Sequence, residues 1–121
     1  MANNHVYSGK RLTYTNGGSA IASGAVVVVG ALVCVALGAI ASGAVGELAV
    51  EGVWNLPKLD AAVIAQGEEV VYDVSSSSFD DNAMTPAAGD VSNACIAWEG
   101  KGATSGETIQ VKINVGVGTV A

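Results

Sequence analysis

Residues 24–37 read Gly-Ala-Val-Val-Val-Val-Gly-Ala-Leu-Val-Cys-Val-Ala-Leu, and they lie in a region between Arg11 and Glu47 that has no Lys, Arg, Asp or Glu. About 20 apolar residues are enough to cross a bilayer as a helix, so a membrane span is one interpretation of this region. Glycines interrupt the run, however, and the side chains between them are mostly β-branched Val, which packs well on a pleated sheet. We therefore predict two short strands, at residues 25–29 and 32–37.

Two other interpretations of this run are weaker. A membrane anchor over residues 20–46 usually has Lys or Arg clusters and aromatic residues at its ends, and the run lacks both. A signal peptide fits less well, because the run starts late and little chain would remain to build a core. We therefore expect no membrane partner.

The composition indicates more apolar side chains than one small core needs. The chain of 121 residues has the size of one domain, yet hydrophobic residues make up 50% of it and charged residues only 13%. Residues 26–29 are apolar on both faces of any strand, whereas a small antiparallel sheet usually has a polar outer face. We therefore expect another protein chain to cover that face, which predicts an oligomer.

Charge and cysteine usage narrow the classes of function. The formal net charge is -6, and the five Lys and Arg are spread over positions 10, 11, 58, 101 and 112. This spread offers no basic patch, which argues against direct nucleic-acid binding. Cys34 and Cys95 both lie in apolar, strand-like segments, so we expect buried free thiols. A disulfide between neighbouring strands is the alternative, and it would need an oxidising compartment.

Alternation of apolar and polar residues predicts further strands along the chain. Residues 47–56 alternate, with Trp54 as the anchoring side chain, and Pro57 ends this strand because it has no N–H for a ladder. In residues 107–117 the odd-numbered positions from 109 onward are apolar and are expected to face inward. The other predicted strands are residues 10–15, 69–74 and 93–98.

Two segments lack this alternation. Residues 60–66 are expected to form at most one helical turn, with Asp60 as its cap and Gly67 as its stop. Residues 75–90 include four consecutive serines and are predicted to be a surface loop.

Many short strands with glycine-rich turns predict an all-β fold, either a small antiparallel β-barrel or a sandwich. Residues 1–9 show no periodicity and are expected to form an extended N-terminal arm. Residues 10–121 are expected to form a single β-domain.

The sequence offers no set of residues for catalysis or metal binding. His5 is the single histidine and has no Cys or acidic residue near it in the sequence, which argues against a metal site or a Ser-His-Asp triad. Asp80, Asp81 and Asp90 lack the spacing of a calcium loop. The Gly-Lys-Gly at 100–102 lacks the remaining residues of a phosphate-binding loop. We therefore predict that the protein is not an enzyme and has no catalytic residue, metal ligand or cofactor.

Several segments, in this order and spacing, resemble the capsid cement or head decoration proteins of tailed bacteriophages. The most specific is Val-Glu-Gly-Val-Trp-Asn-Leu-Pro-Lys at 50–58, followed by Ala-Gln-Gly-Glu-Glu-Val at 65–70. The others are Ser-Gly-Lys-Arg-Leu-Thr-Tyr-Thr at 8–15, the run at 23–36, and Ser-Gly-Glu-Thr-Ile-Gln-Val-Lys-Ile at 105–113. The resemblance covers nearly the whole chain.

The resemblance implies a structural virion protein. Cement proteins of this kind are compact β-domains that bind the outer surface of the expanded capsid, commonly as trimers, and clamp adjacent capsid subunits. The implied partners are the major capsid protein and the chain itself, as a homotrimer. The implied location is the outer surface of the phage head, after synthesis in the host cytoplasm.

The expected contact residues follow from this role. We expect the arm to dock on the capsid or on a neighbouring copy and the Val-rich strands to pack within the trimer or the core; the contact residues are Asn3, Asn4, His5, Val6, Tyr7, Val26 and Val28. Trp54, Pro57, Gly67 and Trp98 are expected to be structural anchors. The alternative function is a head-fibre or surface-displayed adhesion module that recognises the host surface through residues 75–90.

Overall fold

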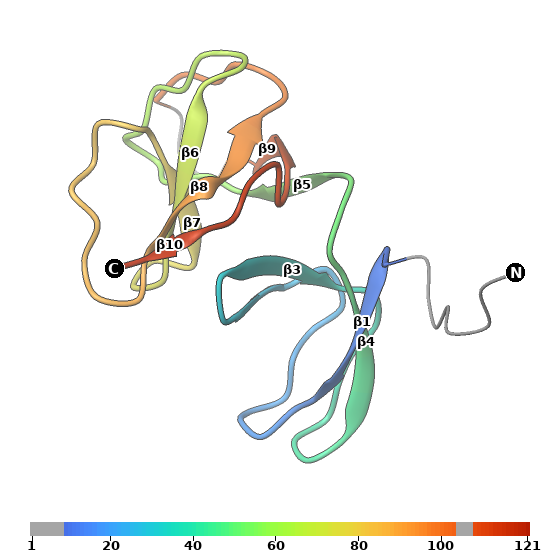
Figure 1. Ribbon diagram of the computed structural model, residues 1–121. Helices are drawn as coiled ribbons and strands as arrows, with labels where there is room; N and C mark the ends of the chain where they lie inside the picture. The colour runs from blue at the N-terminus through green and yellow to red at the C-terminus, as the bar shows by residue number, and fades with distance from the viewer. Residues whose placement is uncertain (1–8, 104–107) are drawn as a thin grey trace, which may run out of the picture.

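In the computed structural model, which describes residues 9–103 and 108–121, the chain is all β and its strands form two antiparallel sheets (Figure 1). The first sheet has the order β1-β4-β3-β2, and its strands are β1 (Arg11–Thr15), β2 (Val26–Val29), β3 (Leu32–Ala36) and β4 (Val45–Ala49). The second has the order β5-β9-β8-β6-β7, with β10 also paired to β8. Its strands are β5 (Val53–Pro57), β6 (Glu69–Asp73), β7 (Ser78–Asp80), β8 (Val91–Ala97), β9 (Thr108–Lys112) and β10 (Thr119–Val120). The all-β prediction is confirmed.

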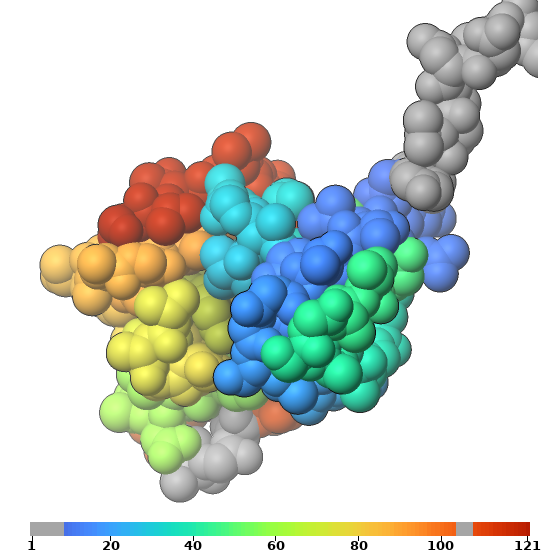
Figure 2. All heavy atoms as spheres, turned by 90° about the horizontal axis from the view of Figure 1, so that it is seen from below, coloured from blue at the N-terminus to red at the C-terminus, as the bar shows by residue number. Residues whose placement is uncertain are grey.

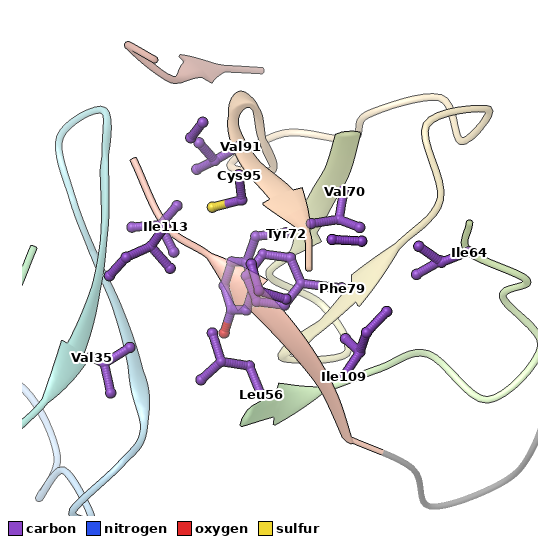
Figure 3. Close-up of a cluster of buried hydrophobic side chains, with 14 of the residues drawn as sticks. Val35, Leu56, Ile64, Val70, Tyr72, Phe79, Val91, Cys95, Ile109 and Ile113 are labelled. Carbon is purple, nitrogen blue, oxygen red and sulfur yellow. The ribbon is translucent and has the colours of Figure 1, made fainter. Parts of the chain in front are cut away.

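The two sheets form a sandwich-like pair, and the barrel alternative is wrong. A bridge between Lys58 and Phe79 brings the two outer strands of the second sheet near each other. Ladder pairing does not continue from that bridge, so the sheet stays open. The main apolar cluster draws on both sheets, and in Figure 3 the rings of Tyr72 and Phe79 lie together in its middle, with centroids 5.1 Å apart.

The Val-rich run forms a hairpin, as predicted, with its strands at Val26–Val29 and Leu32–Ala36. A two-residue loop joins them, and its first residue, Gly30, has a φ of +58°. Val26 and Val28 pack on the main cluster, whereas Val27 and Val29 pack on a second cluster inside the first sheet. Both faces of β2 therefore pack on apolar clusters of the same chain, with all four valines half-buried. The covering partner and the oligomer stay predictions.

The single strand predicted at residues 47–56 is wrong. The chain leaves the first sheet after β4 and enters the second sheet at β5, as the green segment of Figure 1 shows. Gly52 has a φ of +107°, a conformation that side chains rarely adopt, and it interrupts the strand without breaking the apolar alternation of the sequence. The indole Nε1 of Trp54 donates to the Glu51 carbonyl across this bend at 3.0 Å.

The predicted helical turn at residues 60–66 is not formed. Ile64 instead makes a strand-like bridge to Lys101. The buried ammonium of Lys58 donates to the carbonyls of Leu59 and Ala62, at 2.7 Å each. The Leu59 carbonyl also accepts from the Ala62 N–H at 3.0 Å, a single turn that does not continue into a helix.

The predicted loop at residues 75–90 contains the short strand β7. Phe79 in that strand is completely buried, although serines and aspartates surround it in the sequence. Asp90 orders the remainder of the segment: its carboxylate is 1% exposed and accepts hydrogen bonds from the N–H groups of Val74 (3.1 Å) and Ala87 (2.8 Å). Only part of this segment is therefore a surface loop.

The strand predicted at residues 107–117 is too long. β9 ends at Lys112, Ile113 remains buried, and Val115 and Val117 are 45% and 85% exposed. The chain turns at Asn114, whose φ is +55°. Asn is one of the few residues with a side chain that adopt this conformation readily.

Asn114 also joins the two sheets. Its side-chain oxygen accepts from the Val33 N–H at 3.0 Å, and its side-chain nitrogen donates to the Val33 and Val50 carbonyls at 2.8 Å each. β4 pairs with β3 only as far as Val35, because the chain then departs toward β5. Val33 therefore has no ladder partner in β4, and the side-chain amide of Asn114 takes the place of that partner.

Candidate functional site

The structure locates part of the predicted contact set. Asn3, Asn4, His5, Val6 and Tyr7 lie outside the described residues, so the expectation for the arm stays a prediction. Val26 and Val28 lie in β2, which is the outer strand of the first sheet on the side opposite β1.

The backbone of Val26 and Val28 faces outward from the sheet. Residues in an antiparallel ladder alternate between bonding their partner and pointing away from it. Val33, which is opposite Val28, directs its N–H and C=O away from β2 to Asn114. Val28, and by the same alternation Val26, therefore directs its own N–H and C=O to the free edge. This edge is exposed backbone beside side chains that are already half-buried.

A pocket of about 240 Å³ adjoins this edge. Its lining residues come from the start of β2, the end of β5, β6 and the turn after it: Gly24, Ala25, Val26, Pro57, Tyr72 and Ser77. Tyr72 bonds to Ser77 through its side chain, and burial raises the pKa of its phenol. One part of the pocket is thus apolar and another carries hydroxyl groups.

The predicted structural anchors occupy different environments. Trp54 is half-buried against the main cluster, Pro57 is the last residue of β5, and Gly67 takes a φ of +83° in the turn before β6. Trp98 is 49% exposed, and the Lys112 ammonium lies 5.2 Å from its ring centroid. Trp98 therefore lies at the surface with a cation over its ring, in an arrangement that contributes about 0.5–1 kcal/mol at exposed sites.

An exposed apolar surface was missed at the level of sequence. We use the name hairpin-tail patch for the exposed apolar residues of two segments, Leu32 at the hairpin tip and Val115, Val117 and Val120 in the C-terminal segment, which are between 38% and 85% exposed. Figure 2 shows the tip of the β2–β3 hairpin, in cyan, against the C-terminal segment, in red. A Cβ added at Gly118 would lie 2.5 Å from the Ala31 carbonyl oxygen, so the two segments are in tight contact. The pattern 113, 115, 117 indicated a buried strand, which concealed this patch.

The described residues show no centre for metal binding. In residues 9–103 and 108–121, no three His, Cys, Asp or Glu side chains are grouped to hold a metal ion. Asp80 and Asp81 instead accept hydrogen bonds from neighbouring backbone N–H groups, at 2.8 and 2.9 Å. Nor does the part of the chain that the structure describes contain a helix long and apolar enough to cross a membrane.

The cysteines are free and buried, which confirms the expectation of buried free thiols. Burial raises the pKa of Cys34 and of Cys95 to about 11. Both thiols are therefore protonated at neutral pH, and a protonated thiol is a poor nucleophile. Neither is suited to catalysis.

Comparison with known proteins gave one match. A family model described as phage cement protein matches residues 6–113, which is most of the chain. No curated protein matches the sequence. No solved structure matches it either.

Proposed function

The chain belongs to the phage cement protein family, and from this membership we propose that it binds the outer surface of the expanded phage capsid and stabilises the shell by clamping adjacent major capsid subunits. The observation that carries the proposal is the match over residues 6–113, which includes both sheets up to Ile113. The family is structural.

The proposed action is thermodynamic. A protein that binds the assembled shell and not its separated subunits stabilises the shell by mass action. A homotrimer that contacts several capsid subunits at once combines several weak contacts, and the combined attachment is tight. No catalytic residue, cofactor, nucleic acid or membrane takes part in this mechanism, and the net charge of -6 keeps free copies soluble before attachment.

The hairpin-tail patch supports attachment to a protein surface. Its four exposed apolar side chains come from two segments that touch at Ala31 and Gly118. Val117, at 85% exposed, is the most accessible of them. The proposal therefore predicts that a charge at this position weakens capsid binding without unfolding the protein.

The test is co-sedimentation of the purified protein with expanded capsids stripped of it and with unexpanded procapsids. Saturable pelleting with expanded shells at a fixed ratio to capsid protein is the expected result. Val117→Asp is expected to weaken binding by about tenfold or more, the scale of one buried apolar anchor. Val63→Asp is the matched control, because Val63 is 63% exposed and lies outside the patch. A folded protein that pellets with neither shell refutes the proposal.

Deletion of residues 1–8 tests the arm. The proposal expects weaker pelleting with expanded capsids and an unchanged fold, because the described sheets begin at Arg11. Undiminished pelleting would remove the arm from the mechanism. The adhesion alternative predicts instead that the purified protein binds host cells, and that a loop variant such as Asn82→Ala weakens this binding.

A further inference from the structure

The first sheet has a free edge that offers backbone rather than side chains. In the described ranges, 9–103 and 108–121, β2 pairs with β3 alone. Val26 and Val28 direct two N–H and two C=O groups outward from this edge, while their side chains pack on the main cluster. An unpaired edge of this kind accepts an extended segment as a further strand.

The pocket beside this edge gives the added strand a place for one side chain. It has a volume of about 240 Å³, with apolar walls from Ala25, Val26 and Pro57. The side chains of Tyr72 and Ser77, which bond to each other, supply hydroxyl groups. An apolar ring with a polar tip matches these walls, and a tyrosine side chain has that chemistry.

We propose that residues 1–8 of a second copy of this chain add to β2 as a fifth strand and place Tyr7 of that copy in the pocket. The segment reads Met-Ala-Asn-Asn-His-Val-Tyr-Ser and contains no Lys, Arg, Asp or Glu, so pairing buries no charged side chain of these types. The inference rests on the self-association part of the proposed function, and it names the segment and the surface that make the contact.

Chain length argues against the same copy as the donor. The register runs straight across the sheet from Arg11 to Ala49, then to Val35 and Val26. With strands about 4.8 Å apart, a strand beyond β2 lies about 19 Å from β1 along the sheet. Tyr7 is four residues from Arg11 and reaches at most about 14 Å. We therefore assign Tyr7 in the pocket to another copy.

This exchange sets the kind of assembly that forms. Each copy donates one segment and accepts one at a different surface, which is a head-to-tail contact. Such contacts close into a ring when the rotation between copies allows it, and the ring then has no free β2 edge. The inference thus connects two parts of the predicted contact set, the arm and Val26 with Val28, in a single interface.

The test combines oligomeric state with residue-level hydrogen exchange on the full chain and on a deletion of residues 1–8. The full chain is expected to associate and to protect the Val26 and Val28 amides. Deletion is expected to make the protein monomeric and to speed exchange at these two amides by about tenfold or more. The Val27 amide is the internal control, because it bonds to β3 and stays protected in both proteins.

Point variants test the same contact in the full-length chain, so the result does not depend on whether the deletion protein keeps its fold. Tyr7→Ala is expected to weaken association, whereas Tyr7→Phe keeps the ring and is expected to weaken it less. Val28→Pro removes an outward N–H without removing a β2–β3 hydrogen bond, and it is expected to abolish association at unchanged secondary structure. A synthetic peptide of residues 1–9 added to the deletion protein should restore protection at Val26 and Val28.

The outcomes separate this inference from the capsid proposal. A full chain that stays monomeric at every concentration, or protects these amides as a monomer, overturns the inference. So does an oligomer that survives the deletion. If the deletion abolishes capsid pelleting but leaves the oligomer intact, the segment binds capsid instead, and the proposed function stands. An oligomer with a protected β2 edge that binds no capsid supports the inference and refutes the proposed function.

Discussion

Replacing Asn114 with Ala should destabilise the protein strongly, because one side chain, from the segment after β9, serves three backbone groups of β3 and of the link after β4. Its amide bonds the Val33 N–H at 3.0 Å and the Val33 and Val50 carbonyls at 2.8 Å each. Val33 is completely buried, so its two groups have no route to water after the substitution. An unsatisfied buried backbone group costs about 1–3 kcal/mol. Ala at a φ of +55° adds about 1–2 kcal/mol of backbone strain.

Together the two Val33 groups and the strain predict a loss of about 3–8 kcal/mol for Asn114→Ala, a large part of the 5–15 kcal/mol that a typical domain has. Asn114→Gly separates them, because glycine takes this φ without strain and adds only about 0.5–1 kcal/mol through the unfolded chain. Asn114→Asp keeps the acceptor for the Val33 N–H but turns a carboxylate oxygen toward two carbonyls. Protonation relieves that repulsion, so the stability that this variant loses relative to the parent should be smaller near pH 4 than near pH 7.

The assay is urea unfolding at constant temperature, with the slope compared between variants to confirm that the same surface is exposed. Hydrogen exchange at the Val33 amide reports the local effect. A loss below about 1 kcal/mol in both Asn114→Ala and Asn114→Gly would refute the reasoning, because it lies within the net value of one ordinary hydrogen bond. An equal loss for Asn114→Asp relative to the parent at the two pH values would refute the assignment of donor and acceptor in the Asn114 amide.

Three further predictions concern packing and thiols. Gly118→Ala should cost about 1–3 kcal/mol in urea unfolding, because its Cβ would lie 2.5 Å from the Ala31 carbonyl oxygen. Phe79→Ala should cost about 3–5 kcal/mol, because it empties a fully buried site in the main cluster. The thiols of Cys34 and Cys95, with pKa values raised to about 11, should resist a thiol reagent at pH 8 until the protein unfolds. Since the unfolded pKa is about 8.5, they contribute stability that is complete below that pH and is lost as the pH rises toward 11.

Each of these predictions has a matched control. Gly102→Ala should change stability little, because its Cβ would meet nothing within 4 Å. Val63→Ala removes an exposed rather than a buried side chain and should be nearly neutral. The double variant Cys34→Ala, Cys95→Ala should lose less stability than the parent between pH 8.5 and pH 11. Rapid thiol labelling of the folded protein, or a costly Gly102→Ala, would contradict the packing described above.

The sequence predicted the strands that depend on local pattern. Alternation and Val content located β1, β2, β3, β6 and β8 to within a few residues. Where the pattern failed, the cause was not local. Gly52 fits any alternating series because it has no side chain, so a change of sheet looked like a continuous strand. Phe79 lies among polar neighbours, and only its pairing with β6 and the bridge to Lys58 show that it is buried.

The candidate site was predictable in part. The apolar character of Val26 and Val28 could be read directly, whereas their position at an edge depends on the order β1-β4-β3-β2, which is set by contacts far apart in the chain. The adjoining pocket combines residues from four separate segments. The role of Asn114 depends on a partner 81 residues away, and no spacing rule indicates such a contact.

The single passage from one sheet to the other has a consequence for synthesis on the ribosome. Everything that the first sheet needs for its own ladders lies in residues 11–49, so these strands can pair as soon as they emerge. β5 must wait for β9, which begins at Thr108 and is its ladder partner. During that interval the first sheet presents Val33 and Val35 without their covering layer, the kind of surface that promotes aggregation of unfinished chains. Production of the protein in cells should therefore be most sensitive to translation speed and to chaperones while residues 50–107 are being made.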